Sequence, residues 1–368
     1  MNVERSTGNY FMNSKKLQVG IVGCGYVAGP YARDLVTHPE IELVGVTDLD
    51  MERAQRLAGA HGCRVYPTLT DLLSDAEIDL VVNLTTHHAH KDVTEQCLRA
   101  GKHVHSEKPL ALTVKSAHEL VELARERGVR LAGTPFTWMG EAQQTAGKVI
   151  REGRLGKVRV VYAEANWGRL ETWHPAPEPF YEVGALFDVG VYPLAIVTAF
   201  FGPARRVHSY GTVLQPQRVR GDGSPLHVET PDFMATMLEL ENGAVVRLTT
   251  NFYVTQRGKQ GGIEFHGDAG SLYLSSWHMF NAAVEFAEFG QPYVPVPLLR
   301  EPYPGLEWGR SIVELAEAVA ANRPHRASGE HAAHLVEIVC AAHESLRLGQ
   351  PVSVHSHFPP PMPMEWAM

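Results

Sequence analysis

Residues 17–48 constrain the fold most, because they place a glycine-rich turn between an apolar strand and a helix. The apolar run Val19-Gly20-Ile21-Val22 leads directly into Gly23-Cys24-Gly25-Tyr26-Val27-Ala28, a Gly-x-Gly-x-x-Ala pattern. A second apolar run over residues 41–47 ends at Asp48. This order predicts a strand, a helix and a second, parallel strand, with an acid at the end of the second strand.

Each part of the pattern suits one part of a dinucleotide. Gly23 permits a tight turn, Gly25 lets the backbone approach a pyrophosphate, and Ala28 keeps the helix close to the sheet. The helix N-terminus presents free N–H groups to phosphates, with Tyr26 and Val27 in the same turn. Asp48 would accept hydrogen bonds from the adenosine ribose. We therefore predict a nucleotide site, the alternative being an ordinary strand–helix–strand crossover.

The acid also bears on the choice of cofactor. A 2′-phosphate would be repelled by Asp48 and would need a nearby cation. The residues that follow, Leu49-Asp50-Met51, supply none. The sequence therefore favours NAD over NADP.

Composition describes a globular chain with room for two domains. Its 368 residues are 44% hydrophobic and 20% charged, and the net charge of −8 argues against a nucleic-acid partner. Four scattered cysteines have no paired spacing, so we expect reduced thiols and a cytoplasmic protein. No apolar run reaches membrane-spanning length, so we expect no membrane partner.

The pattern of strands and helices divides the chain. Residues 17–135 alternate strand and helix, which predicts an α/β dinucleotide-binding domain with a parallel sheet. Residues 136–355 contain long alternating runs, which predict an α+β domain with a large, open, mainly antiparallel sheet. We expect residues 1–16 to form a disordered leader and residues 356–368 an extended, proline-rich tail.

Local signals place the individual elements. We expect helices near residues 51–60, 91–100, 114–127, 141–152, 308–321 and 329–348, with Thr113 as an N-cap and Gly128 just past a helix end. Strands are expected at residues 78–84, 103–105 and 129–132, and in the second domain at 158–167, 206–213, 233–240, 244–252, 262–266 and 271–274. Asn242-Gly243 predicts a type I′ hairpin turn between two of them.

Three segments together resemble one family. Gly23-Cys24-Gly25 with Asp48, the string 101–110 (Gly-Lys-His-Val-His-Ser-Glu-Lys-Pro-Leu) and the stretch 184–192 are similar to the Gfo/Idh/MocA oxidoreductases. Members include glucose–fructose oxidoreductase, inositol dehydrogenase and dihydrodiol dehydrogenase. The resemblance runs from about Leu17 to Val354. It implies a Rossmann domain and an open-sheet domain, with NAD(P) between them and a sugar, polyol or related alcohol as substrate.

The resemblance also suggests the catalytic residues. Lys108 matches the family lysine that hydrogen-bonds the reacting hydroxyl, and the Lys108–Pro109 bond is often cis in relatives. Asp188 matches a family aspartate, and Tyr192 stands where many relatives have histidine. A free phenol titrates near pH 10, so we expect the Lys108 cation to lower the pKa of Tyr192, letting it take the proton while Asp188 orients substrate or lysine. The alternative is a packing tyrosine that only hydrogen-bonds the hydroxyl, with the proton going to Lys108 or water.

Further contacts follow from the resemblance. Thr85, Thr86, His87 and His90 lie where the family has a cofactor loop, and Glu107 either braces the lysine loop or touches the cofactor. We expect no metal site, because hydride transfer needs none and no acid or cysteine cluster completes the histidines. Sugars combine C–H faces with hydroxyls, so aromatic and polar groups of the second domain are the candidates for substrate contact: Trp138, Arg169, Trp173, His174 and Tyr181.

These inferences converge on an NAD-dependent dehydrogenase acting on a secondary alcohol of a sugar, glycoside or cyclitol. One alternative is an enzyme that oxidises a glycoside transiently in order to cleave it. Another is a nucleotide-sensing regulator that kept the fold and lost catalysis. An open sheet face must be covered, and relatives pair through it, so a homodimer or homotetramer is expected.

Overall fold

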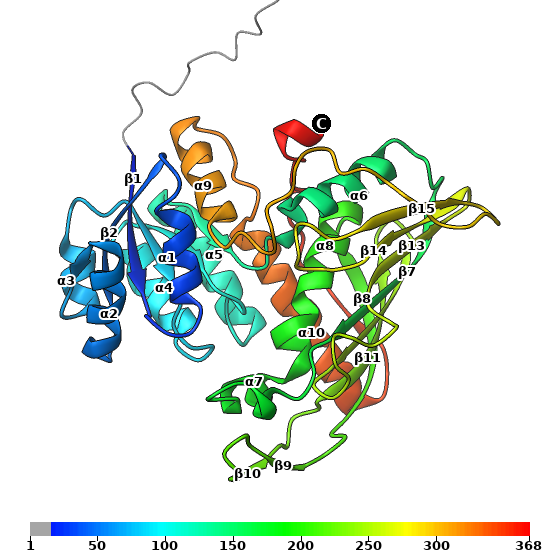
Figure 1. The fold of residues 1–368 in the computed structure, drawn as a ribbon, viewed down its shortest axis with the longest axis horizontal. Coiled ribbons are helices and arrows are strands. Elements are labelled where there is room, and N and C mark those ends of the chain that lie inside the picture. The colour runs from blue at the N-terminus through cyan, green and yellow to red at the C-terminus, as the bar shows by residue number, and fades with distance from the viewer. Residues whose placement is uncertain (1–15) are drawn as a thin grey trace, which may run out of the picture.

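A computed structural model describes residues 16–368, so nearly all of the expected leader lies outside the described residues. Two bodies lie side by side in Figure 1, a helix-flanked sheet formed by the N-terminal third and a larger sheet formed by the rest. Helix α10 (Gly329–Leu348) runs between them. The expected combination of an α/β domain and an α+β domain is confirmed.

The N-terminal sheet has six parallel strands in the order β3-β2-β1-β4-β5-β6. This is the doubly wound order, which places the carboxyl ends of β1 and β4 at a reversal of the winding where ligands bind. Most residues of its central strands are buried, as expected for a parallel sheet covered on both faces. The strands are β1 Leu17–Val22, β2 Ile41–Thr47, β3 Arg64–Val65, β4 Leu80–Asn83, β5 His103–Ser106 and β6 Leu131–Gly133.

Helices cover both faces of this sheet. One face packs against α1 (Ala28–Leu35), α2 (Met51–His61) and α9 (Arg310–Ala320). The other packs against α3 (Leu69–Ser74), α4 (His90–Arg99), α5 (Val114–Arg127) and α10. Two helices from the end of the chain therefore complete the core of the N-terminal domain.

Capping residues fix the helix ends where the sequence indicates them. The Thr113 hydroxyl accepts from the Ser116 amide at the start of α5, and Gly128 ends that helix with φ of 66°. Asp50 caps α2 by accepting from the Glu52 and Arg53 amides. The observed ends of α2 and α4 differ from the expected ones by one residue, within the usual fraying of helix termini.

The second sheet has nine strands in the order β16-β15-β14-β13-β7-β12-β11-β8-β17, antiparallel except for the β7–β12 pair. Its long strands match the predicted runs: β7 Val158–Asn166, β8 Ala204–Thr212, β11 Phe233–Leu240, β12 Val245–Asn251, β13 Gly262–Gly267 and β14 Gly270–Leu274. The shorter β15 Val284–Glu288, β16 Val294–Pro295 and β17 Val352–Ser353 were not predicted, nor was the hairpin of β9 Gln217–Val219 and β10 Pro225–His227.

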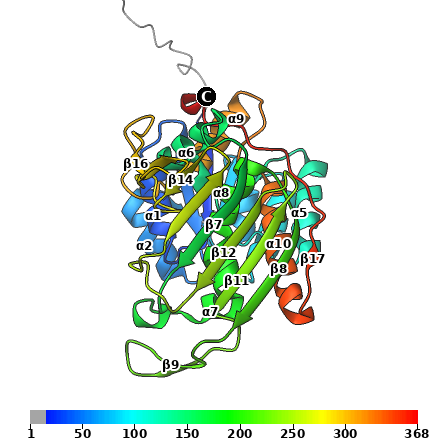
Figure 2. The ribbon, with the colours of Figure 1, turned by 90° about the vertical axis from the view of Figure 1, so that its right-hand side faces the viewer.

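One face of this sheet is covered and the other is open. The covered face packs against α6 (Glu141–Arg151), α8 (Val191–Phe201) and α10. Figure 2 looks onto the opposite face, where β7, β12, β11 and β8 lie in front of these helices. The chain ends on the covered side: the tail is extended through Met364 and then forms a 3-10 turn, Glu365–Ala367, with Ala367 fully buried.

A single apolar stretch among residues 16–368, Glu178–Phe201, is long and apolar enough to cross a membrane, with a mean hydropathy of 1.8. The sequence-based expectation that no apolar run reaches membrane-spanning length does not hold for this stretch. In the fold this stretch is α7 (Glu178–Ala185), a π-helical turn (Leu186–Gly190) and α8, and 83% of the apolar window is buried. Its hydropathy therefore reflects its place in the core of the second domain.

Candidate active site

The glycine turn between β1 and α1 shows why both glycines are needed. Gly23 has φ of 92°, and a Cβ there would lie 2.7 Å from the carbonyl group of Leu84. Gly25, in contrast, has no heavy atom within 4 Å of an added Cβ. The backbone is therefore open at Gly25, beside the exposed Tyr26 and next to Val27 at the start of α1. This open turn fits the pyrophosphate of a dinucleotide.

Asp48 is held beside the glycine turn by two backbone donors. Its Oδ2 accepts from the Cys24 amide at 2.6 Å, and its Oδ1 accepts from the Asp50 amide at 2.7 Å. The carboxylate thereby joins the end of β2 to the turn after β1. Carboxylate oxygens have further lone pairs, so Asp48 can still accept from a ribose hydroxyl.

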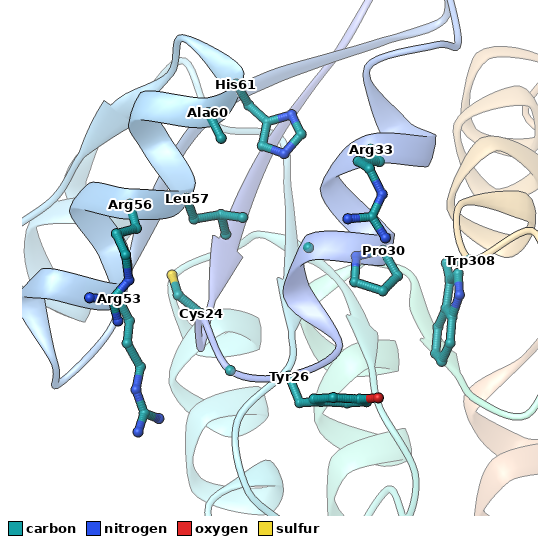
Figure 3. Close-up of a pocket in the computed structure, with 12 residues that line it drawn as sticks. Cys24, Tyr26, Pro30, Arg33, Arg53, Arg56, Leu57, Ala60, His61 and Trp308 are labelled. Atoms are coloured by element: carbon teal, nitrogen blue, oxygen red, sulfur yellow. The ribbon is translucent and has the colours of Figure 1, made fainter. Parts of the chain in front are cut away.

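A groove of about 610 Å³ starts at this turn and runs between α1 and α2 (Figure 3). Arg33 lines it from α1, and Arg53 and Arg56 line it from α2, with Trp308 at its edge. Arg53 also pairs with Asp50 at 3.1 Å. The residues directly after Asp48 had suggested that no cation stands nearby, but helix packing brings three arginines to the groove.

Lys108 and Asp188 meet between the two domains. Lys108 follows β5 at the carboxyl edge of the parallel sheet, and its Nζ forms an ion pair with Asp188 Oδ1. Both side chains are largely buried. Asp188 lies in the π-helical turn, a distortion that is frequent at functional sites. The peptide bond between Lys108 and Pro109 is cis.

Tyr192 lies beside this pair, with the Lys108 Nζ 5.6 Å from the centre of its ring. The cation faces the ring and is paired with Asp188. Burial, followed by the negative charges of Glu107 and Asp188, raises the pKa of Tyr192 well above 10. The expectation that Lys108 lowers this pKa is therefore not met, because the burial of Tyr192 and the two anions raise it.

The expected cofactor loop lies next to the loop that carries Lys108. Thr85 donates to Asn83 at 2.7 Å and Thr86 is exposed. The ring nitrogens of His90 face the carbonyls of Pro109 at 2.8 Å and Thr85 at 3.0 Å, which makes His90 a brace between the two loops. His87 is buried with an unpartnered Nδ1, and burial together with the Lys108 charge lowers its pKa to about 3.

The expected substrate residues separate into two groups. Trp173, exposed by 49%, and His174 lie in the loop after β7, where the His174 ring contacts Tyr26 with centroids 5.3 Å apart. Arg169 lies exposed over the ring of Tyr253.

Trp138 and Tyr181 belong to the second group, which lies inside the protein. Trp138 is 1% exposed in the apolar core. The Tyr181 hydroxyl donates to Glu171 and accepts from Arg218 in a buried network. Their expected contact with substrate is therefore not supported, because neither side chain is accessible.

Sequence reasoning missed several residues at this site. Trp277 packs on Tyr192 with centroids 5.2 Å apart, and Trp167 packs on Trp277. Phe180 contacts both His87 and His174. Only their aromatic character offered a signal, because these contacts join distant parts of the chain.

No group of three potential metal ligands occurs among residues 16–368. His105 is fully buried and its ring nitrogens face Thr134 and Ser311, while His103 accepts from the Arg130 amide. All four cysteines fall within the described range and are free.

Comparison with known proteins gives two family matches. Residues 17–134 match the model of an oxidoreductase family with an NAD-binding Rossmann fold, and residues 143–273 match the GFO/IDH/MocA C-terminal domain. A dTDP-3,4-didehydro-2,6-dideoxy-α-D-glucose 3-reductase of Streptomyces antibioticus is 35% identical over 217 residues, 57% of this chain and 63% of that protein. Trans-1,2-dihydrobenzene-1,2-diol dehydrogenase of Macaca fuscata fuscata is 32% identical over 190 residues, 50% of this chain and 56% of that protein. Each match therefore spans less than two thirds of the relative.

Solved structures share the whole fold at lower identity. Levoglucosan dehydrogenase, in complex with NADH and L-sorbose, superposes with a TM-score of 0.81 at 20% identity, covering 93% of this chain and 99% of that one. Aldose–aldose oxidoreductase from Caulobacter crescentus, complexed with glycerol, gives 0.79 at 21% identity, covering 92% and 100%. The two family models cover both domains and more than half of the sequence, so this chain belongs to the Gfo/Idh/MocA oxidoreductase family.

Proposed function

We propose that this protein is an NAD-dependent dehydrogenase that transfers hydride between a secondary alcohol of a sugar, glycoside or cyclitol and nicotinamide. The observation that carries the proposal is the buried Lys108–Asp188 pair at the carboxyl edge of the parallel sheet, on the same edge as the open glycine turn. Ligands of doubly wound sheets bind at that edge. The named relatives are a sugar 3-reductase and a diol dehydrogenase, which fits an exchange between a C–OH and a C=O group.

The chain offers a complete set of residues to hold the dinucleotide. Gly23, Gly25, Tyr26 and Val27 would hold the pyrophosphate and Asp48 the adenosine ribose. The nicotinamide half would lie against Thr85, Thr86, His87, His90 and Lys108, with Glu107 either touching it or bracing the lysine loop. When bound, the nicotinamide supplies the hydride acceptor or donor. Asp48 favours NAD, while Arg53 in the neighbouring groove offers the cation that a 2′-phosphate would require.

The chemical task of this chain's own residues would be to remove the proton of the reacting hydroxyl, or to return it in the opposite direction. Lys108 would hydrogen-bond the reacting hydroxyl, and its charge would stabilise alkoxide character. Asp188 would hold the ammonium in place. Tyr192 is the proposed proton acceptor. Its raised pKa means that it carries its own proton in the free protein, so it would first have to release that proton, to Asp188 or to water, before taking the one that the hydroxyl loses as hydride leaves the carbon. The alternative acceptors are water and Lys108, which would first have to pass a proton to Asp188.

The decisive experiment is a screen of sugars, glycosides and inositols with NAD and with NADP, following the absorbance of the reduced nicotinamide. Reduction of NAD by at least one alcohol supports the proposal. Substrate cleavage with tightly retained NAD and no net NADH would favour the glycoside-cleaving alternative. Tight binding of NAD without turnover of any alcohol would favour the regulator.

For the assembly we propose a homodimer or homotetramer formed through the open face of the nine-stranded sheet. That face presents aromatic and charged side chains together, including Tyr162 and Tyr210, and Arg247 over the ring of Tyr162. Light scattering coupled to size exclusion measures the mass. A monomer at micromolar concentration would contradict the proposal. We also propose that the protein is cytoplasmic.

A further inference from the structure

A buried tyrosine of helix α1 is hydrogen-bonded to the loop that carries Lys108. The Tyr31 hydroxyl donates to Glu107 Oε1 at 2.6 Å, and the Lys108 amide donates to Glu107 Oε2 at 3.0 Å. Tyr31 has no exposed surface and Glu107 is 7% exposed. Each oxygen of this carboxylate therefore has one donor, from α1 on one side and from the Lys108 backbone on the other.

The surroundings fix this arrangement rigidly. The Tyr31 ring packs against Trp308 with centroids 5.3 Å apart, and the Glu107 amide donates to the Asn83 carbonyl at the end of β4. A hydrogen bond to a charged acceptor is stronger than a neutral one, and a buried carboxylate oxygen left without a donor is costly. Glu107 therefore depends on Tyr31 for one of its two donors and to stay in place.

This arrangement suggests a role that the Lys108–Asp188 pair cannot fill by itself. The ion pair fixes the tip of the lysine side chain, whereas the Glu107 contact fixes its backbone. Helix α1 is also the helix whose N-terminus faces the open glycine turn. A link from α1 to Lys108 therefore couples the place where a dinucleotide would bind to the group that would meet the alcohol.

We propose that Tyr31 is a positioning residue for Lys108, acting through Glu107, so that helix α1 and the lysine backbone are held as one unit. The inference rests on the proposed function of Lys108. It assigns the Glu107 carboxylate to bracing the lysine loop. Tyr31 contacts neither substrate nor cofactor in this role.

The test is Tyr31→Phe, which removes one oxygen and keeps the ring that packs on Trp308. The matched control is Tyr66→Phe, because the Tyr66 hydroxyl also donates to a carboxylate, Asp75 Oδ2, at 2.6 Å in the same domain. We expect kcat to fall about tenfold in Tyr31→Phe with KM for the alcohol changed by less than about twofold, since a loosened lysine loses transition-state contact. Tyr66→Phe should leave kcat unchanged. Equal kcat in Tyr31→Phe and wild type would overturn the inference.

A double-mutant cycle with Glu107→Gln separates positioning from general packing. If Tyr31 acts through the carboxylate, removing its hydroxyl should reduce kcat much less when Glu107 is already glutamine. Additive losses in the double variant would overturn the link through Glu107.

Amide exchange of Lys108 tests the inference without any turnover. Its N–H is bonded to Glu107, so we expect faster hydrogen–deuterium exchange in Tyr31→Phe than in wild type and no change in Tyr66→Phe. Unchanged exchange would overturn the inference. If the wild-type protein turned over no alcohol, the proposed function alone would fail and this exchange would still decide the role of Tyr31.

Discussion

At the scale of single residues, Lys108 carries the largest expected effect. Replacing it with methionine keeps the apolar stem and removes the ammonium paired with Asp188. We expect kcat/KM to fall by about 10²–10⁴-fold, because charge stabilisation and proton handling at the hydroxyl are both lost. Steady-state kinetics measure this. The control is Lys91→Met, whose ammonium forms a partly exposed pair with Glu95 and which should leave the activity unchanged. Comparable activity in the two variants would contradict the assignment of Lys108.

Tyr192→Phe tests where the proton goes. If the phenol accepts it, kcat should fall by about 10²-fold and the pH profile of kcat should lose one limb. The aromatic packing with Trp277 is retained in this variant, so a folding defect is not expected. Unchanged turnover with an unchanged pH profile would refute Tyr192 as the acceptor and leave Lys108 or water in that role.

These residues differ in how far the sequence could reveal them. Lys108, Asp188 and Tyr192 were found because they stand in recognisable strings, and the fold brings them together from positions 80 residues apart. Tyr31 and Trp277 could not be found in this way, since their partners lie far along the chain. The raised pKa of Tyr192 was also hidden, because burial depends on packing that no local pattern describes.

At the scale of elements, the two glycines of the β1–α1 turn allow a matched pair of predictions. Gly23→Ala should destabilise the protein by about 1–3 kcal/mol, because the new methyl would lie 2.7 Å from Leu84 backbone atoms at a positive φ. Gly25→Ala should change the free energy of unfolding by less than about 0.5 kcal/mol, since nothing lies within 4 Å.

Gly25→Ala should nevertheless weaken NAD binding about tenfold or more, because its methyl would occupy the approach of the pyrophosphate to the backbone. Denaturant unfolding and calorimetric titration measure the two effects separately. Wild-type affinity in Gly25→Ala would place the pyrophosphate elsewhere and contradict the proposed cofactor site.

Element prediction succeeded where a periodic run was long enough or a cap was explicit. Helix α5 begins after Thr113 and ends at Gly128 as expected, and Asn242-Gly243 lies in the turn that joins β11 to β12. The expected type I′ geometry is wrong, because Gly243 has a positive φ and Asn242 does not. The two-residue strands β3, β16 and β17 were not predicted, because two residues are too few to show an alternation of apolar and polar side chains. The π-helical turn around Asp188 could not be predicted either, since its extra residue leaves the apolar pattern intact.

At the scale of the whole molecule, the packing of the last two helices against the first domain was the part that the sequence predicted least. Helix α9 packs Ile312 and Leu315 into the core beneath β1, and Ala132 forms a bridge with Ser328 before α10. Both helices were predicted from periodicity. Periodicity indicates which face of a helix is apolar, but it does not indicate which part of the protein that face packs against. The return of residues 310–348 to the first domain is therefore a finding of the structure.

The same close packing buries several histidines in their neutral form. Burial lowers the pKa of His105 and His331 to about 3, and of His278 and His334 to about 4. In the unfolded chain these groups titrate near pH 6.5. Between about pH 6.5 and 4 the unfolded state therefore binds more protons than the folded state, so the free energy of unfolding should fall as the pH falls through this window.

Each such histidine contributes a slope of up to about 1.4 kcal/mol per pH unit inside the window, which makes one substitution measurable. His331→Gln retains a donor for its partner Thr198 and removes one titrating group, so its unfolding free energy should depend less steeply on pH than that of wild type. His88→Gln, at an exposed ion pair with Glu182, is the control and should keep nearly the wild-type slope. Denaturant titrations at several pH values between 4.5 and 7.5, roughly spanning the window, measure the three slopes. The wild-type free energy of unfolding could instead stay level or rise as the pH falls. That result would show that these histidines bind protons in the folded protein, and it would contradict the close packing that lowers their pKa values.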